Sequence, residues 1–92
     1  MDLHDRIAKE LLNQKSLAAL MYLLEKGREL ECFYQDKHLF LSRYGSKNTC
    51  SLCIDGKEEE SFDGAEELVE KARIDGKPFL ETWDEIKLST LF

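Results

Sequence analysis

Three cysteines and one histidine are the residues of this chain best suited to holding a metal ion. Cys50 and Cys53 form a CxxC motif, and Cys32 and His38 precede it. Four such groups make a structural zinc site when they converge tetrahedrally, and two of them usually come from a tight turn. A CxxC motif also serves redox chemistry when its first cysteine begins a helix.

The CxxC motif lies within a predicted strand, residues 49–54, and this position fits neither site. Residues three apart in a strand point to opposite faces of the sheet, so Cys50 faces the core with Leu52 while Cys53 faces the other way. We therefore predict that the cysteines are small apolar strand residues and that no metal or cofactor is bound. The alternative is a zinc site, which predicts one bound ion per chain and unfolding by a chelator. Its ligands would be Cys32, His38, Cys50 and Cys53.

The sequence gives no positive indication of catalysis. His4 is followed by Asp5, which could orient an imidazole, but no nucleophile is placed beside them and the terminal segment is expected to fray. His38 begins a predicted strand, where a surface or rim position is expected. Two histidines and no glycine pattern for nucleotide phosphates give no support to a hydrolase, a transferase or an NTPase. We therefore predict that the protein is not an enzyme.

Carboxylates are concentrated in the second half of the chain. Residues 1–54 carry seven acids and eight bases, a net charge of +1, whereas residues 55–92 carry twelve acids and five bases, a net charge of −7. Within residues 55–70, eight acids accompany a single lysine, Lys57. Net negative charge argues against direct binding to nucleic acid or to an anionic membrane, because phosphate contacts need clustered Lys and Arg.

The first third of the chain is predicted to be helical. Apolar residues recur at helical spacing between Ser16, a suitable N-cap, and Gly27, a suitable C′ residue, which predicts a helix over residues 17–26. A shorter apolar stripe lies within residues 1–15. The sequence leaves open whether this segment continues the same helix or forms a separate peripheral helix.

The middle of the chain is predicted to form an antiparallel β-meander of three to four strands. The predicted strands are residues 30–34, 38–42, 49–54 and 58–62. Residues 35–37 permit the first hairpin turn, and residues 44–48 are predicted to be a loop. Asp55 and Gly56 both tolerate the positive φ of a type I′ turn, which is the strongest hairpin signal in the chain.

Two helices are predicted after the sheet. Asp63 and Glu66 resemble a capping box, and Gly76 is expected to end the first helix. Pro78 suits the first turn of the second helix. The residues of that helix expected to face inward are Phe79, Leu80, Trp83 and Ile86. The predicted fold class is therefore α+β: an N-terminal helix, a three- to four-stranded antiparallel β-meander and two C-terminal helices, in one domain of residues 1–92.

Length and composition set the remaining expectations. An apolar share of 42% over 92 residues is enough for a core, and a stability of about 5–10 kcal/mol is expected. No apolar run approaches the roughly 20 residues of a membrane span, and the amino terminus lacks the pattern of a signal peptide. Three cysteines do not form a disulfide framework. We therefore expect a protein of the reducing cytoplasm.

Two segments resemble small uncharacterised bacterial proteins that are often carried near phage or other mobile elements. The first is residues 25–34, EKGRELECFY, and the second is residues 74–80 together with residues 83–86. The resemblance covers about residues 17–88 and consists of caps, turns and core aromatic residues. Such proteins often have Asn-Gly at the first hairpin, where this chain has Gln-Asp. They have no assigned activity, so the resemblance implies a similar fold outline and a link to mobile elements.

The acidic half of the chain is the main candidate for function. Glu66 and Glu70 are like-charged i, i+4 neighbours on a predicted helix, and Glu81 and Glu85 repeat this relation. Each such pair costs about 0.2–0.5 kcal/mol of helix stability, where a lysine would have been favourable. A run of carboxylates also keeps a small domain in solution, and this is the alternative explanation.

Our first hypothesis is a non-catalytic interaction protein that blocks the basic surface of a nucleic-acid-binding partner. DNA-mimic inhibitors of the anti-CRISPR or anti-restriction type act in this way. The residues expected to bind the partner are Glu58, Glu59, Glu60, Glu66, Glu67, Glu70, Glu81, Asp84 and Glu85.

The second hypothesis is a small binding module or homodimer that uses apolar rather than charged surface. Its exposed anchors would be Tyr22, Phe33, Tyr44 or Phe92. A molecular mass that rises with protein concentration and is insensitive to salt would favour this hypothesis.

Overall fold

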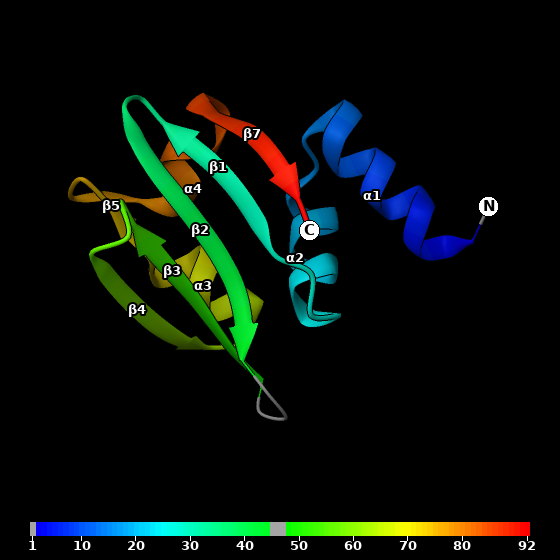
Figure 1. Cartoon of the computed structure of the whole chain (residues 1–92), viewed down its shortest axis with the longest axis horizontal. Helices are drawn as coiled ribbons and strands as arrows, with labels where there is room; N and C mark the ends of the chain where they lie inside the picture. Colours follow the sequence, from blue (N-terminus) through cyan, green and yellow to red (C-terminus); the bar gives the residue numbers. More distant parts are fainter. Residues whose placement is uncertain (1, 45–47) are drawn as a thin grey trace.

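A five-stranded antiparallel sheet with helices on one face forms the body of the protein (Figure 1). The computed structural model describes residues 2–44 and 48–92, without the side chain of Glu58, so residues 45–47 of the predicted loop lie outside the described residues. The helical elements are α1 (Leu3–Gln14), α2 (Leu17–Glu25), α3 (Ala65–Lys71), α4 (Phe79–Thr82) and the 3-10 turn η1 (Trp83–Glu85). The strands are β1 (Leu30–Tyr34), β2 (Lys37–Tyr44), β3 (Thr49–Ile54), β4 (Glu58–Asp63), β5 (Arg73–Ile74), β6 (Lys77–Pro78) and β7 (Ile86–Leu91). The α+β class is thereby confirmed.

The first third of the chain forms two helices, which answers the question that the sequence left open. Asp2 caps α1 by accepting a hydrogen bond from the backbone N–H of Asp5 at 2.9 Å. The side-chain oxygen of Ser16 accepts from the N–H of Ala19 at 3.2 Å and begins α2, as predicted. Lys15, between the helices, has a φ of 54°, a left-handed conformation that a helix cannot continue through.

The core lies between the helices and one face of the sheet. The sheet order is β4-β3-β2-β1-β7, and α2, α3 and α4 all lie behind it in Figure 1. Alternate strand residues point into this layer, among them Leu30, Leu39, Leu41 and Leu52, which are buried together with α2 and α3 side chains. Among the described residues, no helix is both long and apolar enough to cross a membrane.

The hairpin predicted at Asp55 and Gly56 is confirmed. Their φ values are 54° and 68°, and the N–H of Lys57 donates to the carbonyl of Ile54 at 3.0 Å. The following strand, β4, pairs with β3 along its whole length, from Ile54↔Glu58 to Thr49↔Asp63. It is thus one residue longer than predicted.

The first C-terminal helix is shorter than predicted. Helix α3 ends at Lys71, and the next residues form a small hairpin in which Arg73 pairs with Pro78. Asp75 and Gly76 occupy its turn with φ values of 56° and 79°. Since Asp-Gly is a type I′ turn sequence, the hairpin has the same local cause as the one at residues 55–56. Gly76 therefore ends no helix.

The capping of α3 also differs from the predicted box. Its N-cap is Gly64 rather than Asp63. The side chain that reaches back is that of Glu67, not Glu66, and it accepts from the backbone N–H of Asp63. One orphan N–H next to the helix is satisfied in this way.

The prediction of a second C-terminal helix is largely wrong. Only residues 79–82 are α-helical, and after η1 the chain forms strand β7, which pairs with β1 at the sheet edge. Phe79, Trp83 and Ile86 are buried as expected, but Leu80 is exposed. A register shift opposite Glu31 and Cys32 interrupts the pairing of β7 and breaks the period of two by which a strand is predicted.

Candidate interaction surface

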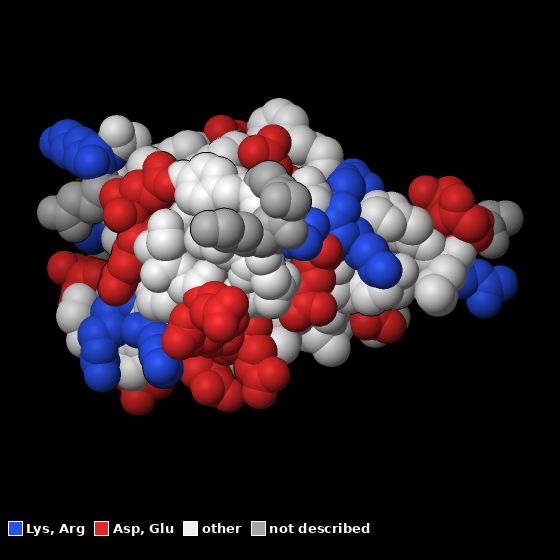
Figure 2. All heavy atoms as spheres, turned by 90° about the horizontal axis from the view of Figure 1, so that it is seen from below, with Lys and Arg blue, Asp and Glu red and all other residues white. Residues whose placement is uncertain are grey.

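Strand β4 and helix α3 present a group of carboxylates at one edge of the sheet. We call this group the acidic edge, and it consists of Glu59, Glu60, Asp63, Glu66, Glu67 and Glu70. Five of these residues are exposed and Glu67 is half-buried. Figure 2 views the molecule from below, where red side chains gather around β4 and α3 and blue Lys or Arg side chains lie next to them. The predicted carboxylates of residues 59–70 are therefore brought together by the fold.

One carboxylate of the acidic edge has a fixed cationic partner. Lys71 donates to Glu67 at 3.0 Å, one turn along α3. The hydrogen bond from the backbone N–H of Asp63, followed by the one from Lys71, holds the pKa of Glu67 below its usual value. Within residues 2–44 and 48–92, no other carboxylate of the edge forms an ion pair. The edge therefore retains most of its negative charge.

The last three predicted partner-binding residues lie elsewhere. Glu81 is on α4, and Asp84 and Glu85 are on η1, which leads into β7 at the opposite edge of the sheet from β4. Burial lowers the pKa of Lys15, and the charge of nearby Asp84 opposes this shift. The ammonium group of Lys15 donates to the carbonyl of Trp83 and lies 5.2 Å from the centroid of the Trp83 ring. Asp84 thus lies near the joint between α1 and α2, and Glu81, Asp84 and Glu85 lie on elements other than β4 and α3. The side chain of Glu58, the remaining predicted residue, lies outside the described part of the structure.

The face of the sheet that is not covered by helices carries aromatic side chains. We call it the open face. Phe33 and Tyr44 lie on it with 37% and 43% of their surface exposed, and Phe92 is 54% exposed. Phe92 packs edge-on against Phe40 of β2, with ring centroids 6.1 Å apart. Three of the four predicted aromatic anchors therefore share this side of the sheet.

The fourth predicted anchor is on another element, and one aromatic residue was missed. Tyr22 belongs to α2, where Lys26 lies 5.4 Å from its ring centroid. Phe40 was missed because it stands in the run Leu39-Phe40-Leu41, whose apolar character hides the alternation between faces. Its place on the open face follows from the buried Leu residues on either side.

A hydrogen-bonded group ties three strands together on the open face. Glu31 of β1 bonds to His38 Nε2 of β2 at 2.8 Å, and Ser89 of β7 donates to the same carboxylate at 3.3 Å. The bond from His38 is the main reason why the pKa of Glu31 lies below its ordinary value. The ring of Phe33 packs edge-on against His38, 5.2 Å away. The arrangement is a cross-strand brace.

The four candidate zinc ligands are divided between the two faces of the sheet. Cys32 and Cys50 are buried in the core on β1 and β3, while His38 and Cys53 lie on the open face. Within the described ranges, no three His, Cys, Asp or Glu side chains are placed to hold a metal ion together. The CxxC motif lies in mid-strand, so it also lacks the helix N-terminus that redox chemistry would need.

We expect the three thiols to differ sharply in their reaction with iodoacetamide at pH 8. Burial raises the pKa of the Cys32 thiol to about 12 and also raises that of Cys50, so neither provides accessible thiolate in the folded protein. Cys53 is half-buried on the open face. Intact-mass analysis should show one carbamidomethyl group on the native chain and three after unfolding in urea. Rapid addition of two or three groups to the native chain would contradict the core positions.

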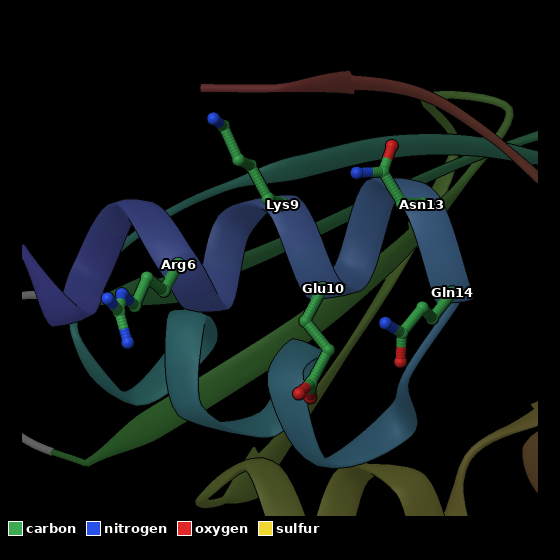
Figure 3. A pocket seen from close by; sticks show the side chains of 5 residues that line it. All are labelled: Arg6, Lys9, Glu10, Asn13 and Gln14. Carbon is green, nitrogen blue, oxygen red and sulfur yellow. The ribbon is translucent and has the colours of Figure 1, made fainter. Parts of the chain in front are cut away.

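Two surface hollows lie among the described residues. The first is lined by residues of α1 alone: Arg6, Lys9, Glu10, Asn13 and Gln14. Figure 3 shows Lys9 and Asn13 on one side of the helix and Glu10 and Gln14 on the other, so the polar groups do not converge. The second lies at the hairpin ends and is lined by Lys37, Ile54, Asp55 and Lys57.

The acidic edge and the open face therefore remain the surfaces on which a function can be argued. Comparison of the chain with protein-family models, with curated proteins and with solved structures found no match.

Proposed function

We propose that the protein is a non-catalytic binding protein whose acidic edge occupies the basic surface of a nucleic-acid-binding partner. The observation that supports this proposal is that the fold gathers six carboxylates on β4 and α3, two elements that are separated in sequence by one residue. Among the described residues, one lysine, Lys71, forms an ion pair with this group. Such a field attracts a basic surface and accelerates association. The carboxylates would stand in for the phosphates that the partner normally binds.

The rigidity of the acidic edge supports the same proposal. Strand β4 is paired with β3 at every residue, and α3 is anchored by Ala65, Leu68 and Val69, which are buried. Side chains on paired strands and packed helices lose less freedom on binding than those on a loop. The acidic edge is therefore better suited to a defined partner than a disordered acidic tail would be.

We expect the double variant Glu66→Gln/Glu70→Gln to lose most of its binding to such a partner. The experiment is a pull-down from cell extract at low salt, with identification of the bound proteins and elution at about 0.5 M salt, where the Debye length is roughly 4 Å. Wild type should retain a nucleic-acid-binding protein that salt releases. The matched control is Glu81→Gln/Glu85→Gln, which removes the same charge from exposed residues outside the acidic edge.

The control variant should bind as wild type does. Equal loss by both double variants would show that net charge acts without a defined surface. Retention of the partner at about 0.5 M salt would show that charge is not the main attraction. Either outcome would count against the proposed function.

The exposed aromatic residues of the open face favour a second candidate function, that of a module or homodimer that binds through apolar surface. In that case sedimentation should show a mass that increases with protein concentration and does not respond to salt. Phe92→Ala would then weaken association, while Glu66→Gln/Glu70→Gln would leave it unchanged.

A further inference from the structure

The acidic edge continues onto the open face of the sheet. Glu59 and Asp63 of β4 are opposite Cys53 and Thr49 of β3 in the register. These two β3 residues are in turn opposite Phe40 and Tyr44 of β2. Three adjacent rows result: carboxylates on β4, small side chains on β3 and aromatic rings on β2.

The row on β3, between the rings and the carboxylates, has small side chains that project little from the sheet. It consists of Thr49, Ser51 and Cys53, and the hydroxyls of Ser51 and Ser42 are hydrogen-bonded to each other at 2.9 Å. Neighbouring strands are about 4.8 Å apart, so the aromatic and acidic rows are separated by about 10 Å. Ser51 is buried, whereas Thr49 and Cys53 are half-buried, so a long side chain from a partner can lie across β3 with its apolar stem on Thr49 or Cys53.

The charge of the open face is complementary to a cation. Its described strand positions carry the carboxylates Glu31, Glu59 and Asp63, and Lys87 is their sole lysine or arginine. The carboxylate of Glu31 is already held by His38, Ser89 and Thr90. Glu59 and Asp63 are exposed and are the carboxylates that would accept hydrogen bonds from a partner's cation.

We infer that the open face receives arginine side chains from the basic surface of the partner. A guanidinium group is planar and weakly hydrated, so one arginine can stack on an aromatic ring of β2 while another donates to a carboxylate of β4. The ammonium group of lysine is compact and strongly hydrated, and gains less from the ring. This inference rests on the proposed function and specifies its partner: the basic surface presents arginine, and the rings of Phe40 and Tyr44 distinguish it from lysine.

The inference is tested with two labelled peptides, nine arginines and nine lysines, by fluorescence anisotropy at low salt. Wild type is expected to bind the arginine peptide about five-fold or more tightly than the lysine peptide. Tyr44→Leu keeps apolar bulk without a ring and should bring the affinity for the arginine peptide close to that for the lysine peptide. Leu80→Ala shortens an exposed apolar side chain on α4 and should leave the preference unchanged.

The outcomes separate this inference from the proposed function. Equal affinity of wild type for the two peptides, both released at about 0.5 M salt, would overturn the arginine inference and leave the acidic edge as the binding element. A preference for arginine that persists undiminished in Tyr44→Leu would also overturn it. Absence of binding to either peptide at low salt would overturn the proposed function and the inference together.

Discussion

Replacement of Leu68 by Ala is expected to lower the free energy of unfolding by about 2–5 kcal/mol, the range for a leucine truncated in a packed core. Leu68 is fully buried in the middle of α3, so its loss leaves a cavity between this helix and the sheet. Urea denaturation followed by circular dichroism measures the effect as a lower midpoint at an unchanged slope. Because α3 carries three carboxylates of the acidic edge, the same variant should also weaken partner binding.

Leu80→Ala is the control for this prediction, because it makes the same chemical change at an exposed position of the neighbouring helix α4. A surface change of this kind is expected to stay within about 0.5 kcal/mol. If the two leucine variants had equal unfolding midpoints, α3 would not be packed on the sheet as described. The acidic edge would then lack its rigid support.

Elements with local causes were predicted well. Helix α2 begins at Ser16 because that side chain caps it, and the turn at Asp55 and Gly56 forms because both residues accept positive φ. The hairpin at Asp75 and Gly76 has the same turn sequence but was missed. Its strands are only two residues long each, so they show no alternation that a sequence pattern could reveal.

Strand β7 could not be predicted from local pattern. Its partner, β1, lies more than 50 residues earlier in the chain, and the pairing Leu30↔Leu91 is set by the tertiary fold. The register shift near Glu31 displaces Leu91 from the alternation that begins at Ile86 and Leu88. The apolar residues that follow Phe79 therefore fit the period of a helix as well as that of a strand, and their spacing does not distinguish the two.

The candidate surface was predictable only where its residues are close together in the sequence. The carboxylates of β4 and α3 adjoin in sequence, so a single short connection brings them together. The carboxylates of α4 and η1 depend on the path of the chain through the β5–β6 hairpin, which the sequence did not reveal. The rows on the open face require the register of β2, β3 and β4, which only the structure supplies. The sequence shows which residues carry charge, but it does not show which residues lie beside them in space.

Gly64 joins β4 to α3, and its replacement by Ala is expected to lower the free energy of unfolding by about 1–3 kcal/mol. Its φ of 98° and ψ of 168° belong to a region that residues with a Cβ atom rarely adopt, and an added Cβ would lie 2.7 Å from the side-chain nitrogen of Asn48. The control is Gly56→Asn, because Gly56 has a φ of 68° with no atom near its Cβ position, a conformation that asparagine tolerates. Urea midpoints for the two variants should therefore differ clearly. If Gly64→Ala were as stable as Gly56→Asn, the β4–α3 junction would not need glycine, and the fixed geometry we assign to the acidic edge would lose its backbone cause.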